Sequence, residues 1–339
     1  MNHGFIKVAS AIPEVKVADC EFNSFKIQKI IEQADSKGVE IICFPELSIS
    51  AYTCADLFFQ KTLLESAKKS LVNLVENTST LNIICIVGLP LVLNDKLFNV
   101  AAVFAKGKIL GFVPKTYLPN YYEFYEKRWF SSAKDAVNKE LYLNTEDYSD
   151  GISKKPIESQ FCEADRISKP ESSIVNEDLT IDKSDEIDVE RRKIEFVVSG
   201  QNPSSGNNYY PFTSKLIFGN DKVKFSIEIC EDLWAPTPPS SGHCPAGAHL
   251  VFNLSASNEL IGKHIYRKEL IMQQSAKCMA GYIYSGSGWG ESTTDIVFSG
   301  NAIIAENGAI LNEAERFSFS EQLVIADIDV DRLKVNRAQ

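Results

Sequence analysis

The sequence of 339 residues has no long apolar run: no stretch approaches the roughly 18 residues that a membrane-spanning helix needs. A secretory leader is not expected either, because residues Met1 to Glu14 contain no basic segment followed by a long apolar run. Positive charge is in deficit, and the formal net charge of −10 argues against a nucleic-acid backbone as the main partner. We therefore expect a soluble, cytoplasmic protein that binds neither membranes nor nucleic acids.

The sequence also lacks the common metal and redox motifs. No two of its eight cysteines are three positions apart, so neither a CxxC zinc site nor a redox pair is indicated. The four histidines form no HExxH motif and no pair four residues apart, so we expect no metal site. The glycine-rich segment from Gly286 to Gly290 lacks the GxGxxG spacing of a dinucleotide fingerprint and is interpreted as a loop.

The overall composition is that of a globular protein, with 44% apolar and 24% charged residues, which excludes a wholly disordered or fibrous chain. The negative charge is concentrated in residues 131–190, which hold sixteen acidic and seven basic residues. A stretch of this composition cannot bury enough apolar surface to offset the entropy of ordering it. We expect one domain over residues 1–339 with an acidic, partly mobile insertion at about 140–195, either a solvated surface segment or a partner-binding arm.

Short apolar runs alternate with helical patterns, which indicates an α/β fold. Brief turns between some runs indicate antiparallel hairpins, so we expect two mixed sheets packed face to face with helices outside. The expected helices are Phe22–Ser36, Lys61–Asn77 and Ile265–Met279, the last with an apolar stripe of Ile265, Met272, Ala276 and Met279. The expected hairpin turns are Asn94–Lys96, Lys106–Lys108 and Glu306–Gly308. The expected strands are Phe5–Ala9, Val39–Phe44, Ile83–Leu93, Phe98–Phe104, Ile109–Val113, Ile194–Val198, Phe225–Ile229, His249–Leu254, Gly281–Ser285, Ala302–Ala305 and Gln322–Ile328.

Three of these runs are followed by a residue that can take part in catalysis. Glu46 and Lys115 each follow a run and a proline, and Cys230 follows its run directly. The ends of strands are where α/β proteins tend to place their ligands. A carboxylate, an amine and a thiol suit nucleophilic catalysis, in which the cation lowers the pKa of the thiol and the carboxylate moves its proton.

Strand alternation places Phe225, Ile227 and Ile229 toward a core and Cys230 on the opposite side. Taken singly, each candidate also has a structural interpretation. Cys230 could be a buried core thiol, and the two charged residues could be surface charges or members of ion pairs. Spacing alone does not bring the three together.

Three segments around these residues resemble, in order, the signature blocks of the nitrilase superfamily: Phe44–Leu47, Pro114–Pro119 and Glu228–Trp234. More narrowly, KTYLPNYYEFYEKRWF from Lys115, the EICEDLW block and NLSASNELIG from Asn253 resemble the amino-terminal glutaminase domain of glutamine-dependent NAD synthetases. The resemblance covers the chain except for about 140–195, and it implies a nitrilase-like α-β-β-α sandwich.

The resemblance implies a catalytic triad of Glu46, Lys115 and Cys230 that hydrolyses the side-chain amide of L-glutamine through a thioester. Glu46 would act as general base and then as acid, while Lys115 and the backbone N–H of Glu231 would bind the oxyanion. Glu123 matches a second glutamate of the family that orients the site.

For substrate binding, the family pattern points to Tyr121, Glu231, Ser257 and Lys263. Relatives often carry arginine at the last position, whereas a lysine offers a point charge to the α-carboxylate of the substrate. The alternative is that Lys263 is a solvated lysine at a helix start, where a cation is mildly unfavourable.

The resemblance also implies the partners. The glutaminase reaction needs no cofactor, and ATP and Mg serve only a synthetase domain that accepts the ammonia and amidates nicotinic acid adenine dinucleotide to NAD. We also expect a homo-oligomer. The Ser-Gly-Gly-x-Asp-Ser phosphate loop of that domain is absent from the 339 residues, so we expect the amidotransferase half alone. The alternatives are a free-standing amidase or nitrilase acting on another small amide and, if the triad were broken, a non-enzymatic docking scaffold.

Overall fold

The computed structural model describes residues 4–144, 197–198 and 208–338. The acidic insertion expected at about 140–195 lies outside the described residues except for its first five. Of these, Glu140–Tyr142 form strand β8, which pairs with β10 (Tyr209–Pro211).

The first large sheet has six strands in the order β17-β1-β2-β3-β4-β5. Strand β2 lies parallel to both of its neighbours, whereas the other pairs are antiparallel, so the sheet is mixed. The strands are β1 (Phe5–Ile12), β2 (Ile41–Cys43), β3 (Ile84–Leu93), β4 (Lys96–Ala105), β5 (Lys108–Pro114) and β17 (Gln322–Asp329).

The second large sheet has seven strands in the order β16-β15-β14-β13-β12-β11-β9. Its centre, β12 to β14, is parallel, and its outer strands are antiparallel. The strands are β9 (Val197–Val198), β11 (Ile217–Gly219), β12 (Lys224–Ile229), β13 (Leu250–Ser255), β14 (Gly281–Gly286), β15 (Ala302–Glu306) and β16 (Ala309–Glu313).

The expected hairpins are confirmed, and their turns have the conformation that tight hairpins need. Asn94 and Asp95 join β3 to β4, and both have positive φ, of 50° and 59°. Lys106 and Gly107 join β4 to β5 with φ of 51° and 71°. Two consecutive positive φ values match the right-handed twist of the flanking strands.

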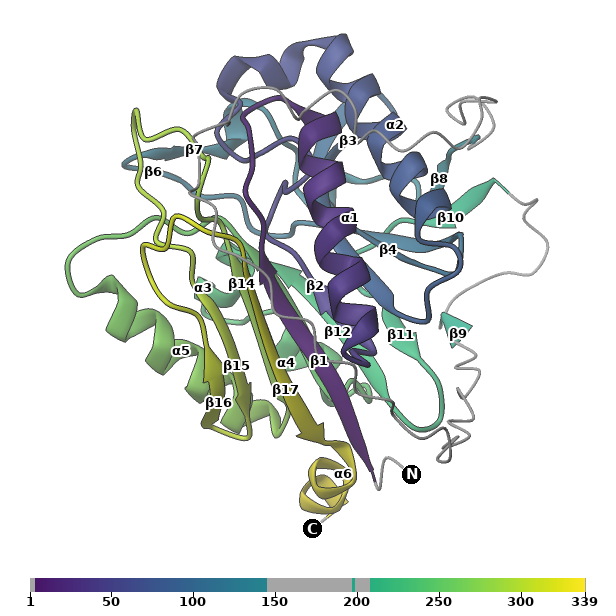
Figure 1. Ribbon diagram of the computed structural model, residues 1–339, viewed down its shortest axis with the longest axis vertical. Coiled ribbons are helices and arrows are strands. Elements are labelled where there is room, and N and C mark those ends of the chain that lie inside the picture. Colours follow the sequence, from purple (N-terminus) through teal and green to yellow (C-terminus); the bar gives the residue numbers. More distant parts are fainter. Residues whose placement is uncertain (1–3, 145–196, 199–207, 339) are drawn as a thin grey trace, which may run out of the picture. The chain divides into compact units, whose positions relative to one another are not determined.

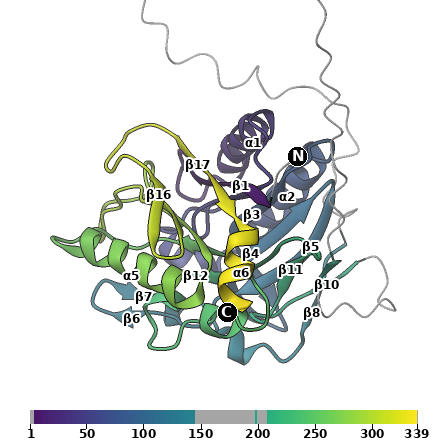
Figure 2. The ribbon, with the colours of Figure 1, turned by 90° about the horizontal axis from the view of Figure 1, so that it is seen from below.

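The two sheets pack face to face, and helices cover their outer faces. Buried side chains of both sheets form one shared apolar cluster between them. Helices α1 (Cys20–Ser36) and α2 (Lys61–Asn77) pack on the outer face of the six-stranded sheet through a second cluster. Helix α5 (Lys263–Cys278) covers the seven-stranded sheet through a third, and Figures 1 and 2 show it away from α1 and α2. The α-β-β-α sandwich implied by the resemblance is therefore confirmed.

The expected apolar stripe on α5 is wrong. Ile265 is 64% exposed and Met279 40%, and the helix instead buries Arg267, Ile271, Gln274 and Ser275. Hydropathy fails here because the inner face of α5 is largely polar, with the Arg267 guanidinium hydrogen-bonded to Glu259 and to the carbonyl of Asn258.

Short elements escaped the sequence-based prediction because they carry little periodicity. They include the strands β6 (Asn120–Tyr121), β7 (Phe124–Tyr125), β8, β10, β11 and β16, the 3₁₀ helices η1 (Ala55–Phe59), η2 (Glu126–Arg128) and η3 (Ala133–Asp135), and the helices α3 (Glu231–Trp234), α4 (Ser240–His243) and α6 (Val330–Ala338). Across residues 4–144, 197–198 and 208–338, no helix is long and apolar enough to cross a membrane.

Candidate active site

Glu46 and Lys115 meet at the ends of two strands of the six-stranded sheet. Glu46 follows β2 and Lys115 follows β5, and both side chains are fully buried. The Lys115 Nζ donates to Glu46 Oε1 over 2.6 Å. Asn99 Nδ2, from β4, donates to the same oxygen over 2.6 Å, and the backbone N–H of Ala256 donates to Glu46 Oε2 over 2.9 Å. These three hydrogen bonds together fix the orientation of the Glu46 carboxylate.

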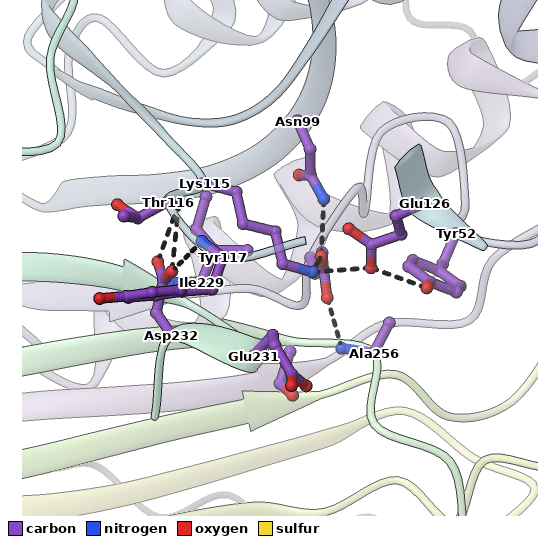
Figure 3. A network of polar contacts seen from close by, with 12 residues as sticks. Tyr52, Asn99, Lys115, Thr116, Tyr117, Glu126, Ile229, Glu231, Asp232 and Ala256 are labelled. Atoms are coloured by element: carbon purple, nitrogen blue, oxygen red, sulfur yellow. Dashed lines mark hydrogen bonds and ion pairs between the residues drawn. The ribbon is translucent and has the colours of Figure 1, made fainter. Parts of the chain in front are cut away.

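Lys115 has a second carboxylate partner, Glu126 at the start of η2. Its Nζ donates to Glu126 Oε1 over 2.7 Å, and that oxygen also accepts from the Tyr52 hydroxyl over 2.8 Å. Figure 3 shows the ammonium in this chain of contacts, with Tyr52 beyond Glu126. One buried ammonium thus joins two buried carboxylates.

These contacts set the ionisation of the cluster. Burial disfavours the Lys115 ammonium, but the carboxylates of Glu126 and Glu46 outweigh it and hold the pKa of Lys115 well above its usual value. Burial also raises the pKa of Glu126 to about 7, although the Lys115 charge opposes the rise. Lys115 is therefore a permanent cation at neutral pH.

Cys230 reaches this cluster from the other sheet. It follows β12, its backbone N–H donates to the carbonyl of Leu254 over 2.8 Å, and its φ of 45° turns the chain into α3. The expected alternation is wrong at this residue: Cys230 joins the apolar cluster between the sheets together with Phe225, Ile227 and Ile229. The positive φ breaks the two-residue period and brings the thiol to the inner side.

The thiol interacts electrostatically with Glu46, Lys115 and Glu126, so the structure brings all three sequence-predicted triad residues together. Burial and then the Glu46 carboxylate raise the pKa of Cys230, and the Lys115 ammonium only partly offsets them. The expected effect of the cation, to lower the thiol pKa, is confirmed in direction, but burial and the Glu46 carboxylate outweigh it. Both influences favour the protonated thiol over the thiolate.

Glu123 lies elsewhere. Its carboxylate accepts from Asn258 Nδ2, and Asn258 Oδ1 in turn accepts from the ammonium of Lys263. The structure places Glu126, three residues on, against Lys115 instead of Glu123. Hydrophobic periodicity does not distinguish the two glutamates in the sequence, because the segment between β5 and η3 holds only elements of two or three residues.

The predicted substrate residues gather near the same strand ends. The Tyr121 hydroxyl donates to the Glu231 carboxylate at 3.0 Å from both oxygens. Ser257 Oγ accepts from buried Arg267 over 3.4 Å. The Lys263 ammonium lies 5.2 Å from the ring centroid of Trp234, and burial lowers its pKa although Cys230 and Glu231 oppose the shift. Lys263 is thus oriented toward the site and is half-buried.

A cavity of about 610 Å³ adjoins the site. Glu231, Trp234 and Thr116 contribute to its wall, so it opens beside the residue that follows Cys230. Within the described parts of the chain, no group of three or more His, Cys, Asp or Glu side chains could hold a metal ion.

Two contacts of the cluster, Asn99 and Tyr52, were missed by sequence reasoning. Asn99 carried a usable signal, because it is a lone amide within the apolar run of β4, where a polar side chain needs a specific partner. Tyr52 carried none, since it stands in a segment without regular structure.

A family model of carbon-nitrogen hydrolases matches residues 7–338, so the chain belongs to the carbon-nitrogen hydrolase family. Solved structures agree on the fold. A carbon-nitrogen hydrolase from Helicobacter pylori G27 superposes with a TM-score of 0.63 at 15% identity, covering 100% of this chain and 94% of that one. A glutamine-dependent NAD(+) synthetase from Cytophaga hutchinsonii gives 0.69 at 24% identity, covering 96% of this chain and 43% of that one.

Among curated proteins, the chain is similar to glutamine-dependent NAD(+) synthetases. The protein of that name from Mycobacterium tuberculosis H37Rv is 31% identical over 338 residues, which are 99% of this chain and 41% of the relative. The Homo sapiens protein is 25% identical over 335 residues, or 98% of this chain and 40% of the relative. The chain thus spans about two fifths of the length of these relatives.

Proposed function

We propose that this chain hydrolyses the side-chain amide of L-glutamine and supplies the ammonia to a synthetase domain. That domain would use ATP and Mg to amidate nicotinic acid adenine dinucleotide to NAD. The observation that carries the proposal is the buried arrangement of Glu46, Lys115 and Cys230 at the junction of two sheets. Its support is the similarity to proteins named glutamine-dependent NAD(+) synthetase over nearly the whole chain.

The first step is attack of the Cys230 sulfur on the amide carbon. Because the resting thiol is protonated, Glu46 takes its proton as the S–C bond forms, and the carbonyl π electrons move to oxygen. Glu46 then gives the proton to the amide nitrogen, the C–N bond breaks and ammonia leaves. The product on the enzyme is a glutamyl thioester.

The negative oxygen of the tetrahedral intermediate needs donors in fixed positions. The Lys115 ammonium supplies one, and the backbone N–H of Glu231, the first residue of α3, supplies the other. Loss of one such donor typically costs roughly 100- to 1,000-fold in rate. Glu126, by accepting a second hydrogen bond from the Lys115 ammonium, keeps that donor in place, and we assign it the orienting role expected of Glu123.

Water completes the cycle. Glu46 takes a proton from the water molecule as its oxygen attacks the thioester carbon, and the C–S bond breaks with return of a proton to sulfur. Glutamate leaves, and the protein carries the same protons as at the start. No group outside the chain is needed for this half of the reaction.

Tyr121, Glu231, Ser257 and Lys263 recognise the substrate in this scheme. The Lys263 ammonium faces the α-carboxylate, while the Glu231 carboxylate suits the α-ammonium. Charges of both signs on facing elements match an amino acid better than a simple amide. We further propose that the protein acts in the cytoplasm and assembles into a homo-oligomer.

The test is release of glutamate and ammonia by the purified chain from L-glutamine, compared with L-asparagine, glutaramide and a simple aliphatic amide. A clear preference for L-glutamine that disappears in Cys230→Ala supports the proposal. A higher rate on the simple amide would favour a free-standing amidase, and no turnover of any amide would favour a scaffold.

A further inference from the structure

Asp232 is a buried carboxylate two residues after Cys230, with only 2% of its surface exposed. Three backbone N–H groups converge on it. Those of Thr116 and Tyr117 donate to Oδ1 over 3.1 and 2.8 Å, and that of Ile229 donates to Oδ2 over 2.9 Å. Figure 3 shows all three contacts beside the Lys115 side chain.

The three donors come from two different sheets. Thr116 and Tyr117 directly follow Lys115 at the end of β5, whereas Ile229 is the last residue of β12 and precedes Cys230. The large sheets meet through side-chain packing, and no ladder of hydrogen bonds joins their described strands. The Asp232 carboxylate therefore forms a direct polar link between the segment that carries Lys115 and the turn that carries Cys230.

The rest of the Lys115 backbone is held on its own side. Its N–H donates to the carbonyl of Asn99 over 2.9 Å, and its carbonyl accepts from Ala133 over 2.8 Å. These bonds fix the residue within its sheet but say nothing about its distance from Cys230. The distance between Lys115 and Cys230 depends on contacts between the two sheets. The two hydrogen bonds from Thr116 and Tyr117 to Asp232 Oδ1 are such a contact, and a stiff one.

The chemistry of the link explains why a carboxylate stands there. A carboxyl group has two oxygens with about four acceptor sites, so it can accept all three N–H groups together. An asparagine of the same shape would turn an N–H₂ group toward one of the donors. Burial raises the pKa of Asp232 to about 8, while the backbone N–H groups of Ile229 and Tyr117 oppose the rise.

We propose that Asp232 is a positioning residue that sets the distance between the Lys115 ammonium and the Cys230 thiol. The proposal rests on the proposed function for its kinetic part, because the reaction needs Lys115 close to the oxygen that Cys230 attack creates. Misplacement by about 1 Å can cost about 100-fold in rate.

The test compares Asp232→Asn with Glu228→Gln. Glu228 is a matched control: it is also buried, lies on β12 two residues before Cys230, and accepts from the backbone N–H of Ser240 over 3.0 Å and from the Tyr282 hydroxyl. Burial raises its pKa too, but it contacts the outer face of the sheet and does not link the triad. Both changes replace one buried carboxyl group with an amide of nearly the same shape.

We expect Asp232→Asn to lower kcat for glutamine by about 10- to 100-fold with KM changed by less than about threefold. We also expect slower alkylation of Cys230 by iodoacetamide, because the displaced ammonium stabilises the thiolate less. Glu228→Gln should change neither quantity by more than about twofold, whatever its effect on Tm. The alkylation rate needs no substrate, so it tests the link even if the chain does not hydrolyse glutamine.

Three results would overturn the proposal: kcat and alkylation of Asp232→Asn within about twofold of wild type, equal losses in both variants, or a loss confined to KM. If Asp232→Asn does not fold, Asp232→Ser takes its place with the same readouts. Failure of both to fold, with Glu228→Gln folded, would make Asp232 a folding residue and would also overturn the positioning role.

Discussion

Exchange of Glu126 for glutamine separates the two glutamates that compete for the orienting role. The change keeps the shape of the side chain, and a glutamine Oε1 can still accept from Lys115 and from Tyr52. What disappears is one negative charge from a cluster in which two carboxylates hold one buried ammonium. Glu123→Gln is the matched control, because it makes the same exchange three residues away against Asn258.

The size of the effect follows from the contact that is weakened. A hydrogen bond to a charged partner contributes about 1.5–3 kcal/mol, and about 1.4 kcal/mol corresponds to a tenfold change in rate. If the orienting role is real, kcat should fall by about 10- to 150-fold, nearer the lower value because glutamine keeps an acceptor. KM should change little, since the predicted substrate residues are untouched.

The assay is glutamate release at saturating glutamine, with Tm measured for each variant. At neutral pH, Glu126→Gln should keep its Tm, because it removes a buried charge whose desolvation was unfavourable. Glu123→Gln should keep kcat within about threefold of wild type. A larger loss of kcat in Glu123→Gln than in Glu126→Gln would refute the reasoning and return the role to Glu123.

Three further outcomes are expected. A glutamine-derived electrophile should label Cys230 before the other cysteines, and labelling of Cys54 or Cys244 first, read by peptide mass spectrometry, would contradict the assignment of the nucleophile. Lys263→Ala should raise KM for glutamine by about tenfold with kcat less affected, because one charged contact to the α-carboxylate is lost; an unchanged KM would assign that contact to another residue. The stability of wild type relative to Glu126→Gln should fall as pH rises from about 5 to about 8. The folded-state pKa of Glu126, about 7, lies above the ordinary 4.5, so its contribution to stability is present at low pH and is lost through that range. A Tm difference between the two proteins that stays constant over this range would contradict the prediction.

Strand ends could be predicted from the sequence because each is marked locally. Glu46, Lys115 and Cys230 all follow short apolar runs, and the runs overlap strands β2, β5 and β12 of the structure. The contacts among these three residues could not be predicted from the strands alone, because the residues come together between two different sheets. The resemblance to a family predicted that the three residues form one site, and the structure gives the contacts that bring them together.

Side chains in irregular or polar surroundings were harder to predict. Glu126 and Glu123 stand in the same irregular segment, and only tertiary contacts decide which one reaches Lys115. On α5, the buried guanidinium of Arg267 takes an inner position that hydropathy assigns to an apolar residue. Both errors come from buried charges, whose cost is met by partners on other segments that hydropathy does not mark: Lys115 for Glu126 and Glu259 for Arg267.

The charges around Cys230 explain how the thiol can be protonated at rest and still act as the nucleophile during the reaction. A lone cation beside a thiol lowers its pKa, but here Lys115 is shared between Glu46 and Glu126, and the Glu46 carboxylate outweighs its effect on the thiol. Burial acts in the same direction, and both favour the thiol over the thiolate. A nucleophilic thiolate then has to form inside the complex, as the proton moves to Glu46 and the developing oxyanion takes up the charge of Lys115. Lys115 is paired with two carboxylates before the reaction. Its ammonium can then stabilise the oxyanion when negative charge forms on the substrate.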